Sequence, residues 1–155
     1  MKIDIIKKKA EIAISQLEKM NDKYTDYIKA VGQKLFSIPL DKLPGDELVQ
    51  YGLKLSGVYT YLLNISAKKR AERDFFEQLY DEAYNDAYLE YKGEDNVTNA
   101  RVKAQRDCSD IKKVVIIKDY EKNDLENLIK ACERLTSFIQ SAMRVKEGER
   151  FKSYD

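Results

Sequence analysis

Hydrophobic residues recur every three or four positions along most of the chain, which is the period of an amphipathic α-helix. In the first segment the repeat runs through Ile3, Ile6, Ala10, Ala13, Leu17, Met20, Tyr24, Tyr27 and Val31. Near the end of the chain the same spacing runs through Leu125, Leu128, Cys132, Leu135, Ile139 and Ala142. The pattern predicts helices that pack along heptad seams, either against other helices of the same chain or against a second copy.

Two clusters of helix-breaking residues divide this pattern. Residues 37–46 contain both prolines and a glycine, and the sequence KGEDN at 92–96 forms the second cluster. Such clusters mark turns. We therefore expect helices over residues 2–36, 46–91 and 98–146, with Thr98 as the N-cap of the last one. The β-branched run VVII at 114–117 could form a strand, but it has no partner strand and is interpreted as helix.

The expected fold is all-α: an elongated antiparallel array of three long helices that forms a single helical domain over residues 1–155. The short connections favour antiparallel neighbours. The composition agrees, because only two prolines and six glycines occur in 155 residues, of which 43% are hydrophobic. A single layer of three long helices would leave apolar side chains exposed, so we expect the protein to self-associate.

The residue types that are missing narrow the possible chemistry. The chain has no histidine, so it lacks the commonest general base and the commonest transition-metal ligand. Cys108 and Cys132 have neither metal-binding nor redox spacing; we expect two buried thiols in a reducing compartment, with a disulfide as the alternative. No phosphate-binding glycine loop and no nucleophile with a partner base is present. We therefore expect a protein that is not an enzyme and that needs no metal or cofactor.

The hydropathy pattern predicts a cytoplasmic protein that does not bind membranes. No apolar run approaches the roughly 18 residues that a membrane helix needs. The first 15 residues, MKIDIIKKKAEIAIS, carry charges where a signal peptide requires an uninterrupted apolar stretch.

Basic residues are clustered although the formal net charge is only +1. One cluster is Lys7 to Lys9, a second lies at 68–73 and a looser third runs from 101 to 118. A turn near residue 95 would place residue 73 beside about residue 117, so the clusters converge. Convergent cations bind the phosphates of nucleic acid, and the candidate residues are Lys68, Lys69, Arg70, Arg73, Lys112 and Lys113. The alternative is that these cations are solvated or paired with carboxylates of their own helices.

Four aromatic residues follow one another at helical spacing: Phe76, Tyr80, Tyr84 and Tyr88. Such a row could stack nucleic-acid bases. However, residues 81–95 carry six acidic residues against one lysine, and this charge would repel phosphate. The row is therefore interpreted as part of the core or as an oligomer interface, where tyrosine is common.

Three segments occur in an order that resembles the recombination mediator proteins of tailed bacteriophages. They are YTYLL at 59–63, LEYKGEDN at 89–96 and FIQSAMRVK at 138–146, and the resemblance spans roughly residues 48–146. It implies a ring-forming helical protein in the host cytoplasm that binds single-stranded DNA. Such a mediator displaces single-strand-binding protein and helps to load a strand-exchange recombinase in its place. Where that family has basic residues before the glycine turn, this chain has Asn85, Asp86 and Glu90, which moves the expected DNA contact toward residues 68–73.

Two functions follow from these observations. The first is an oligomeric single-stranded-DNA-binding recombination mediator. The alternative is a helical structural or adaptor protein that acts through protein–protein interfaces and does not bind nucleic acid.

Overall fold

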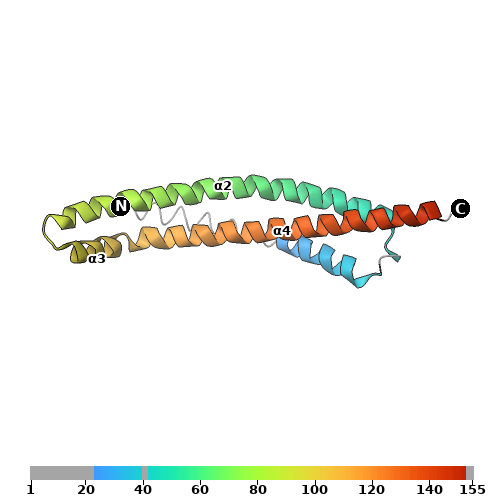
Figure 1. Ribbon diagram of the computed structural model, residues 1–155, viewed down its shortest axis with the longest axis horizontal. Coiled ribbons are helices and arrows are strands. Elements are labelled where there is room, and N and C mark those ends of the chain that lie inside the picture. Colours follow the sequence, from blue (N-terminus) through green and yellow to red (C-terminus); the bar gives the residue numbers. More distant parts are fainter. Residues whose placement is uncertain (1–22, 40–41, 153–155) are drawn as a thin grey trace. The chain divides into compact units, whose positions relative to one another are not determined.

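Helices account for every regular element in the described part of the chain. The computed structural model describes residues 23–39 and 42–152, and side chains up to residue 148. A first helix over residues 23–37 is followed by α2 (Gly45–Lys92), α3 (Val97–Asp107) and α4 (Ser109–Lys152) (Figure 1). The all-α prediction is confirmed. The predicted seam from Ile3 to Met20 and the cluster Lys7 to Lys9 lie outside the described residues.

Both predicted breaks between helices are present. The first helix ends at residue 37, and α2 begins at Gly45, directly after the second proline. The backbone N–H of Leu48 donates to the carbonyl oxygen of Pro44 at 3.2 Å, which closes the first turn of α2. Asp46 and Glu47 lie in this turn, where negative charge is favourable near the N-terminal end of the helix dipole.

The predicted third helix differs from the structure in two ways. Its N-cap is Asn96, not Thr98: the Asn96 side chain accepts a hydrogen bond from the backbone N–H of Asn99 at 2.9 Å. The helix is also interrupted at Cys108, whose ψ of 6° departs from helical geometry and separates α3 from α4. No proline or glycine marks this interruption, so the expected count of three long helices is not confirmed. The run 114–117 is helical, as expected.

Contacts divide the chain into two compact units, and α2 and α4 each pass through both. Among the described residues, unit 1 comprises 66–124, and unit 2 comprises 23–39, 42–65 and 125–152. Each unit is described by itself below.

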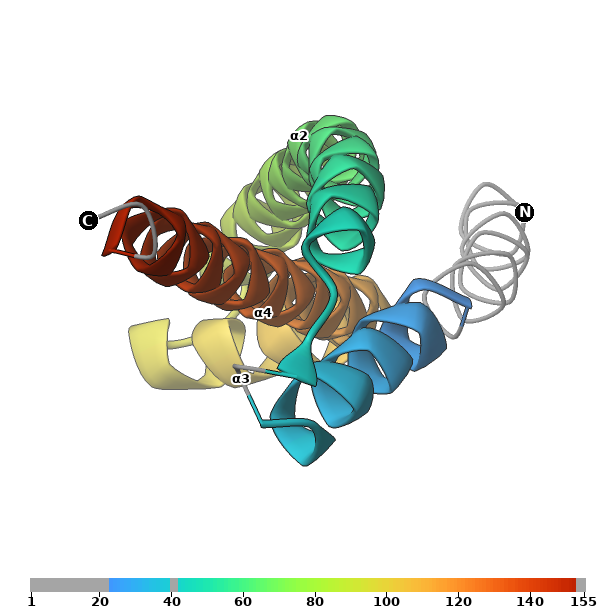
Figure 2. The same ribbon diagram turned by 90° about the vertical axis from the view of Figure 1, so that its right-hand side faces the viewer.

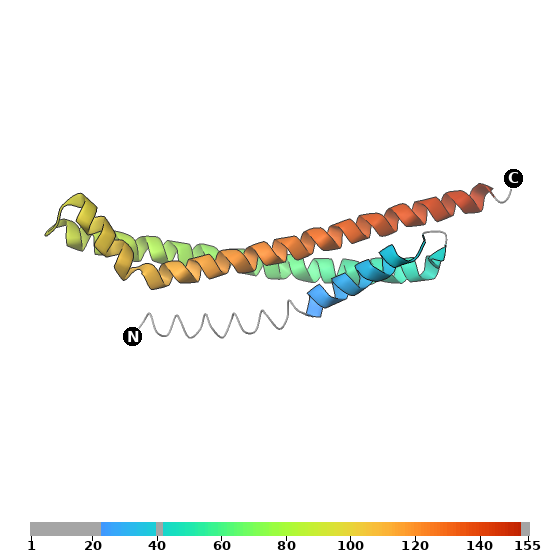
Figure 3. The same cartoon turned by 90° about the horizontal axis from the view of Figure 1, so that it is seen from below.

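Unit 2 has a hydrophobic core built from three helical segments. Figures 2 and 3 show the first helix, the beginning of α2 and the end of α4 that surround it. The largest contributors with no more than 1% exposure are Leu35, Leu43, Leu48, Leu55, Leu62, Leu125, Cys132 and Ile139. Each fully buried leucine stabilises the fold by about 1.5–3 kcal/mol relative to an exposed one. The predicted seam from Leu125 to Ala142 is therefore a core seam.

Close helix approach in unit 2 depends on small residues. A Cβ atom added at Gly32 would lie 3.7 Å from Leu135, and one added at Gly52 would lie 3.6 Å from Ile139. These positions therefore leave no room for a large side chain. The Sγ atom of Cys132 lies 3.3 Å from the carbonyl oxygen of Leu55. Both cysteines are free and buried, as the sequence predicted.

Unit 1 is a hairpin with a thin apolar core. The side chains of Glu72 and Lys118, which are 46 positions apart in the sequence, form a hydrogen bond. Those of Tyr91 and Asp107, which are 16 positions apart, form another. The separation shrinks toward the turn at 93–96. The buried hydrophobic residues are mostly small or β-branched: Ala100, Ala104, Cys108, Ile111, Val114 and Val115. Charged and aromatic side chains therefore make much of the contact between the two arms.

Candidate nucleic-acid interface

The predicted basic patch contains a buried cluster of ion pairs. Lys69 is only 6% exposed, and its ammonium group lies 2.6 Å from Glu72 and 3.4 Å from Glu121. Lys118 is 1% exposed and lies 3.2 Å and 3.1 Å from the same two carboxylates. Two lysines thus face two glutamates. Lys69 cannot reach a phosphate without leaving this cluster, so it is a structural residue here.

Burial and charge act in opposite directions on Glu72. Desolvation raises the pKa of its carboxyl group, but the hydrogen bonds and positive charges of Lys69 and Lys118 outweigh this effect. The pKa of Glu72 is therefore lowered below its ordinary value. The cluster holds this side chain in its charged form.

Arg73 is also engaged within the chain. Its Nε donates to Asp119 at 2.9 Å, and its terminal nitrogens donate to Asp74 at 3.2 Å and to Glu77. The hydrogen bonds to Asp119 and Asp74, together with the nearby negative charges, raise the pKa of the guanidinium group. A guanidinium surrounded by three carboxylates has little capacity left for phosphate.

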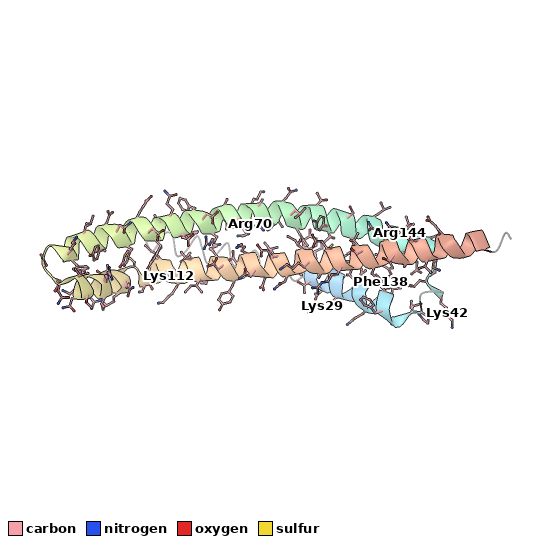
Figure 4. All side chains as sticks on the ribbon, viewed as in Figure 1. Lys29, Lys42, Arg70, Lys112, Phe138 and Arg144 are labelled. Atoms are coloured by element: carbon pink, nitrogen blue, oxygen red, sulfur yellow. The ribbon has the colours of Figure 1, made fainter. Side chains whose placement is uncertain are left out.

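The other four candidates lie on the surface of unit 1. Lys113 pairs with Asp110 at 3.1 Å and is 72% exposed, and Lys112 lies 4.8 Å from the ring centre of Tyr80. Arg70 and Lys112 lie on α2 and α4, respectively (Figure 4). Lys68 is exposed and has no ion pair or hydrogen bond to another described residue. The patch therefore offers fewer available cations than its sequence suggests.

The aromatic row forms a stack along α2. The rings of Tyr80 and Tyr84 are 6.1 Å apart and those of Tyr84 and Tyr88 are 6.3 Å apart. Lys112 lies over Tyr80, and Lys118 lies 6.0 Å from the ring centre of Phe76. All four aromatic side chains are half-buried within unit 1. Their assignment to an oligomer interface stays a prediction.

The positive charge of the protein is concentrated elsewhere. The described part of unit 1 has twelve basic and fourteen acidic residues, whereas that of unit 2 has eleven basic and seven acidic residues. Seven basic side chains of unit 2 have no ion pair with any described residue: Lys23, Lys29, Lys42, Lys54, Lys130, Arg134 and Arg144. Lys29, Lys42 and Arg144 come from three different segments (Figure 4). Unit 2 therefore has the larger supply of available cations.

Two of these cations line a cavity of about 410 Å³ in unit 2. Its lining residues are Lys23, Tyr24, Tyr27, Lys54, Gly57, Val58 and Tyr61. The rings of Tyr24 and Tyr61 are 4.9 Å apart and tilted by 37°. Among the described residues, no acidic side chain lines the cavity. Aromatic walls with lysines suit a flat ligand that carries negative charge.

One lining residue, Tyr27, has a hydroxyl group that points into the core and not into the open space. The hydroxyl oxygen of Tyr27 is buried and makes no hydrogen bond to the described residues. Burial, with smaller effects from Tyr51 and Cys132, raises the pKa of this hydroxyl. It therefore stays protonated at neutral pH and can donate a hydrogen bond.

The sequence pattern placed Tyr24 and Tyr27 in a packing seam and Tyr61 in the YTYLL segment, but it did not indicate Lys54 or Gly57 as site residues. A signal was present: residues 54, 57, 58 and 61 follow the three- and four-residue spacing of one helix face. The glycine in the middle of that face leaves space where another residue would place a side chain. A Cβ atom added at Gly57 would have no neighbour within 4 Å, which agrees with an open site.

The described residues contain no set of three or more histidine, cysteine, aspartate or glutamate side chains arranged to hold a metal ion. No described helix combines the length and apolar character that crossing a membrane requires. Comparison with known proteins found no matching family model, no matching curated protein and no matching solved structure.

Proposed function

We propose that this protein binds single-stranded DNA without catalysing a reaction, as a recombination mediator, and that the DNA contacts unit 2. The observation that supports this proposal is the group of seven basic side chains in unit 2 that have no ion pair within the described residues. Cations without internal partners are the ones that can bind phosphate at the lowest cost. The partners are single-stranded DNA, further copies of the chain, a recombinase and a single-strand-binding protein.

The mechanism is electrostatic capture of the sugar–phosphate backbone. Each phosphate that a lysine or arginine neutralises releases a counterion, so affinity falls with salt by a slope of about 0.7 per contact on a single strand. Backbone contacts carry little sequence information, which suits a mediator that must act on any sequence. Self-association would present several such surfaces to one strand and raise the overall affinity by avidity.

The test is fluorescence anisotropy of a labelled 40-residue strand at several salt concentrations. The variant Lys130→Gln/Arg134→Gln removes two exposed cations, one helical turn apart on α4. Loss of two phosphate contacts would reduce the salt slope by about 1.4. The matched control is Lys68→Gln/Lys113→Gln, which removes two exposed cations from unit 1. Absence of binding by the wild-type chain even at low salt would overturn the proposal.

The second candidate is a helical adaptor that acts through protein contacts alone. The observation that favours it is an apolar face on α4 made by Ile116, Ile117 and Tyr120, which are 45%, 37% and 69% exposed. Their spacing places them on neighbouring positions of one helix surface. For this candidate, Ile117→Lys would change the mass measured by light scattering, and no DNA binding would be found.

A further inference from the structure

We propose that the tyrosine-lined cavity of unit 2 holds one unpaired nucleobase, while Lys23 and Lys54 bind the adjacent phosphate. This inference rests on the proposed function and names the contact by which a single strand is distinguished from a duplex. Its basis is a juxtaposition of three features in one place: space, aromatic walls and two lysines that have no ion pair with the described residues.

The space and the walls fit a nucleobase. The volume of about 410 Å³ lies within the range of about 300–1,000 Å³ that is usual for small-molecule sites. Tyr24 and Tyr61 contribute two rings that lie 4.9 Å apart, and Val58 adds an apolar surface. Bases of any kind stack on such rings, because every base has a π-face. The site therefore accepts a base without selecting its identity.

The polar groups fit the rest of a nucleotide. Lys23 and Lys54 have no ion pair with a described residue, and none of the described carboxylates lines the cavity. A phosphate is thus attracted there, whereas a cationic ligand is repelled.

The same geometry disfavours duplex DNA. A base that is stacked and paired inside a duplex reaches a cavity only after it is flipped out, which costs a few kcal/mol. An unpaired base enters the cavity at a much lower cost in free energy, because no base pair has to be broken. The cavity thus predicts preference for single strands, which backbone phosphate contacts alone would not produce.

The first experiment compares two 20-residue strands in fluorescence anisotropy with the full chain. One is oligo(dT) and the other has the same backbone with abasic sites at every position except the labelled end. We expect at least a tenfold weaker affinity for the abasic strand, because stacking on an aromatic side chain is worth about 1–3 kcal/mol per base. Equal affinities would overturn the inference and leave electrostatic binding intact.

The second experiment fills the cavity. Gly57 lines the cavity, and an added Cβ atom there meets nothing within 4 Å, so we expect Gly57→Leu to fold and to occupy the cavity with its side chain. Gly148→Leu is the matched control, because a Cβ atom there also meets nothing within 4 Å. We expect Gly57→Leu to weaken binding of oligo(dT) at least tenfold and Gly148→Leu to leave it unchanged. Thermal unfolding followed by circular dichroism verifies that both variants fold.

Three substitutions separate the roles of the side chains. Tyr61→Phe keeps the ring and should bind like the wild type, whereas Tyr61→Leu should bind about tenfold more weakly. Lys54→Gln should reduce the salt slope by about 0.7, as expected for one lost phosphate contact. If the chain binds DNA but Gly57→Leu binds equally well, the cavity assignment is wrong and the proposed function stands. If the wild type binds no DNA, both are wrong.

Discussion

The ammonium group of Lys118 lies 3.1 Å from the carboxylate of Glu121, one turn further along α4, and only 1% of the Lys118 side chain is exposed. Lys118 precedes Leu125 by seven residues, and Lys69 follows Leu62 by seven. Both lysines thus stand at heptad positions that leucine occupies one repeat away. Their charges are satisfied by Glu72 and Glu121 instead of by solvent. A polar layer at such positions specifies the register of the two paired helices.

Removing one carboxylate from this layer should destabilise the protein strongly. Glu121→Gln would leave Lys69 and Lys118 with Glu72 as their shared carboxylate in the described cluster. We expect a loss of about 3 kcal/mol in the free energy of unfolding, because an uncompensated buried charge is costly. Urea denaturation measures it. The control is Lys113→Gln, which removes a cation that is 72% exposed and should cost less than about 1 kcal/mol. Equal losses in the two variants would contradict a buried cluster.

Glu72 should contribute to the pH dependence of stability on the acidic side. Its pKa in the folded state is lowered from the ordinary 4.5, so the folded state binds the proton less tightly than the unfolded state does. The stabilisation is therefore fully present above pH 4.5 and is lost as the pH falls through the lower, folded-state pKa. Glu72→Gln should be less stable than the wild type at pH 7, and the difference should shrink on acidification below pH 4.5. Urea denaturation between pH 7 and pH 3 measures this, and a constant difference would argue against the assignment.

The sequence predicted the helical elements better than the site. The spacing of Leu125, Cys132 and Ile139 was sufficient to identify a core seam, because burial of apolar side chains requires that period. The interruption at Cys108 was not predictable, because it depends on one ψ angle and not on a breaking residue. The burial of Lys69 was missed for a different reason. The residue was grouped with its basic neighbours in the sequence, although its heptad position indicated burial and its carboxylate partners come from α2 and α4.

The cavity could not be predicted from the sequence, because it requires two segments to meet. Lys23 and Tyr24 come from the first helix, and Lys54, Gly57 and Tyr61 come from α2. Periodicity assigns each residue to a helix face but does not say which faces leave space between them. Local spacing thus identifies packing, whereas a site made by two helices needs their contact to be known.

The N-cap of α3 offers a direct comparison of the sequence prediction with the structure. Asn96 accepts a hydrogen bond from the N–H of Asn99 at 2.9 Å, so Asn96→Ala should lower the free energy of unfolding by about 1 kcal/mol. Thr98→Ala should change it by less than about 0.5 kcal/mol, because Thr98 is exposed and lies inside the first turn. Denaturant unfolding of the two variants measures both values. A larger effect at Thr98 would restore the original prediction for this helix terminus.

The two thiols should be unreactive until the protein unfolds. Burial, with a smaller effect from a neighbouring acidic residue, raises the pKa of both Cys108 and Cys132, and a thiol without thiolate character reacts slowly. We expect modification by a disulfide reagent at pH 8 to be on the order of 100-fold slower than in denaturing urea, because access requires local opening. The single variants Cys108→Ala and Cys132→Ala each leave one thiol, so the modification rates of Cys132 and Cys108 are measured separately. Cys132 should react more slowly, since it lies in the leucine-rich core of unit 2 against the Leu55 carbonyl, whereas Cys108 lies at the break between α3 and α4. Faster reaction of Cys132 would mean that the core of unit 2 opens more readily than this helix junction.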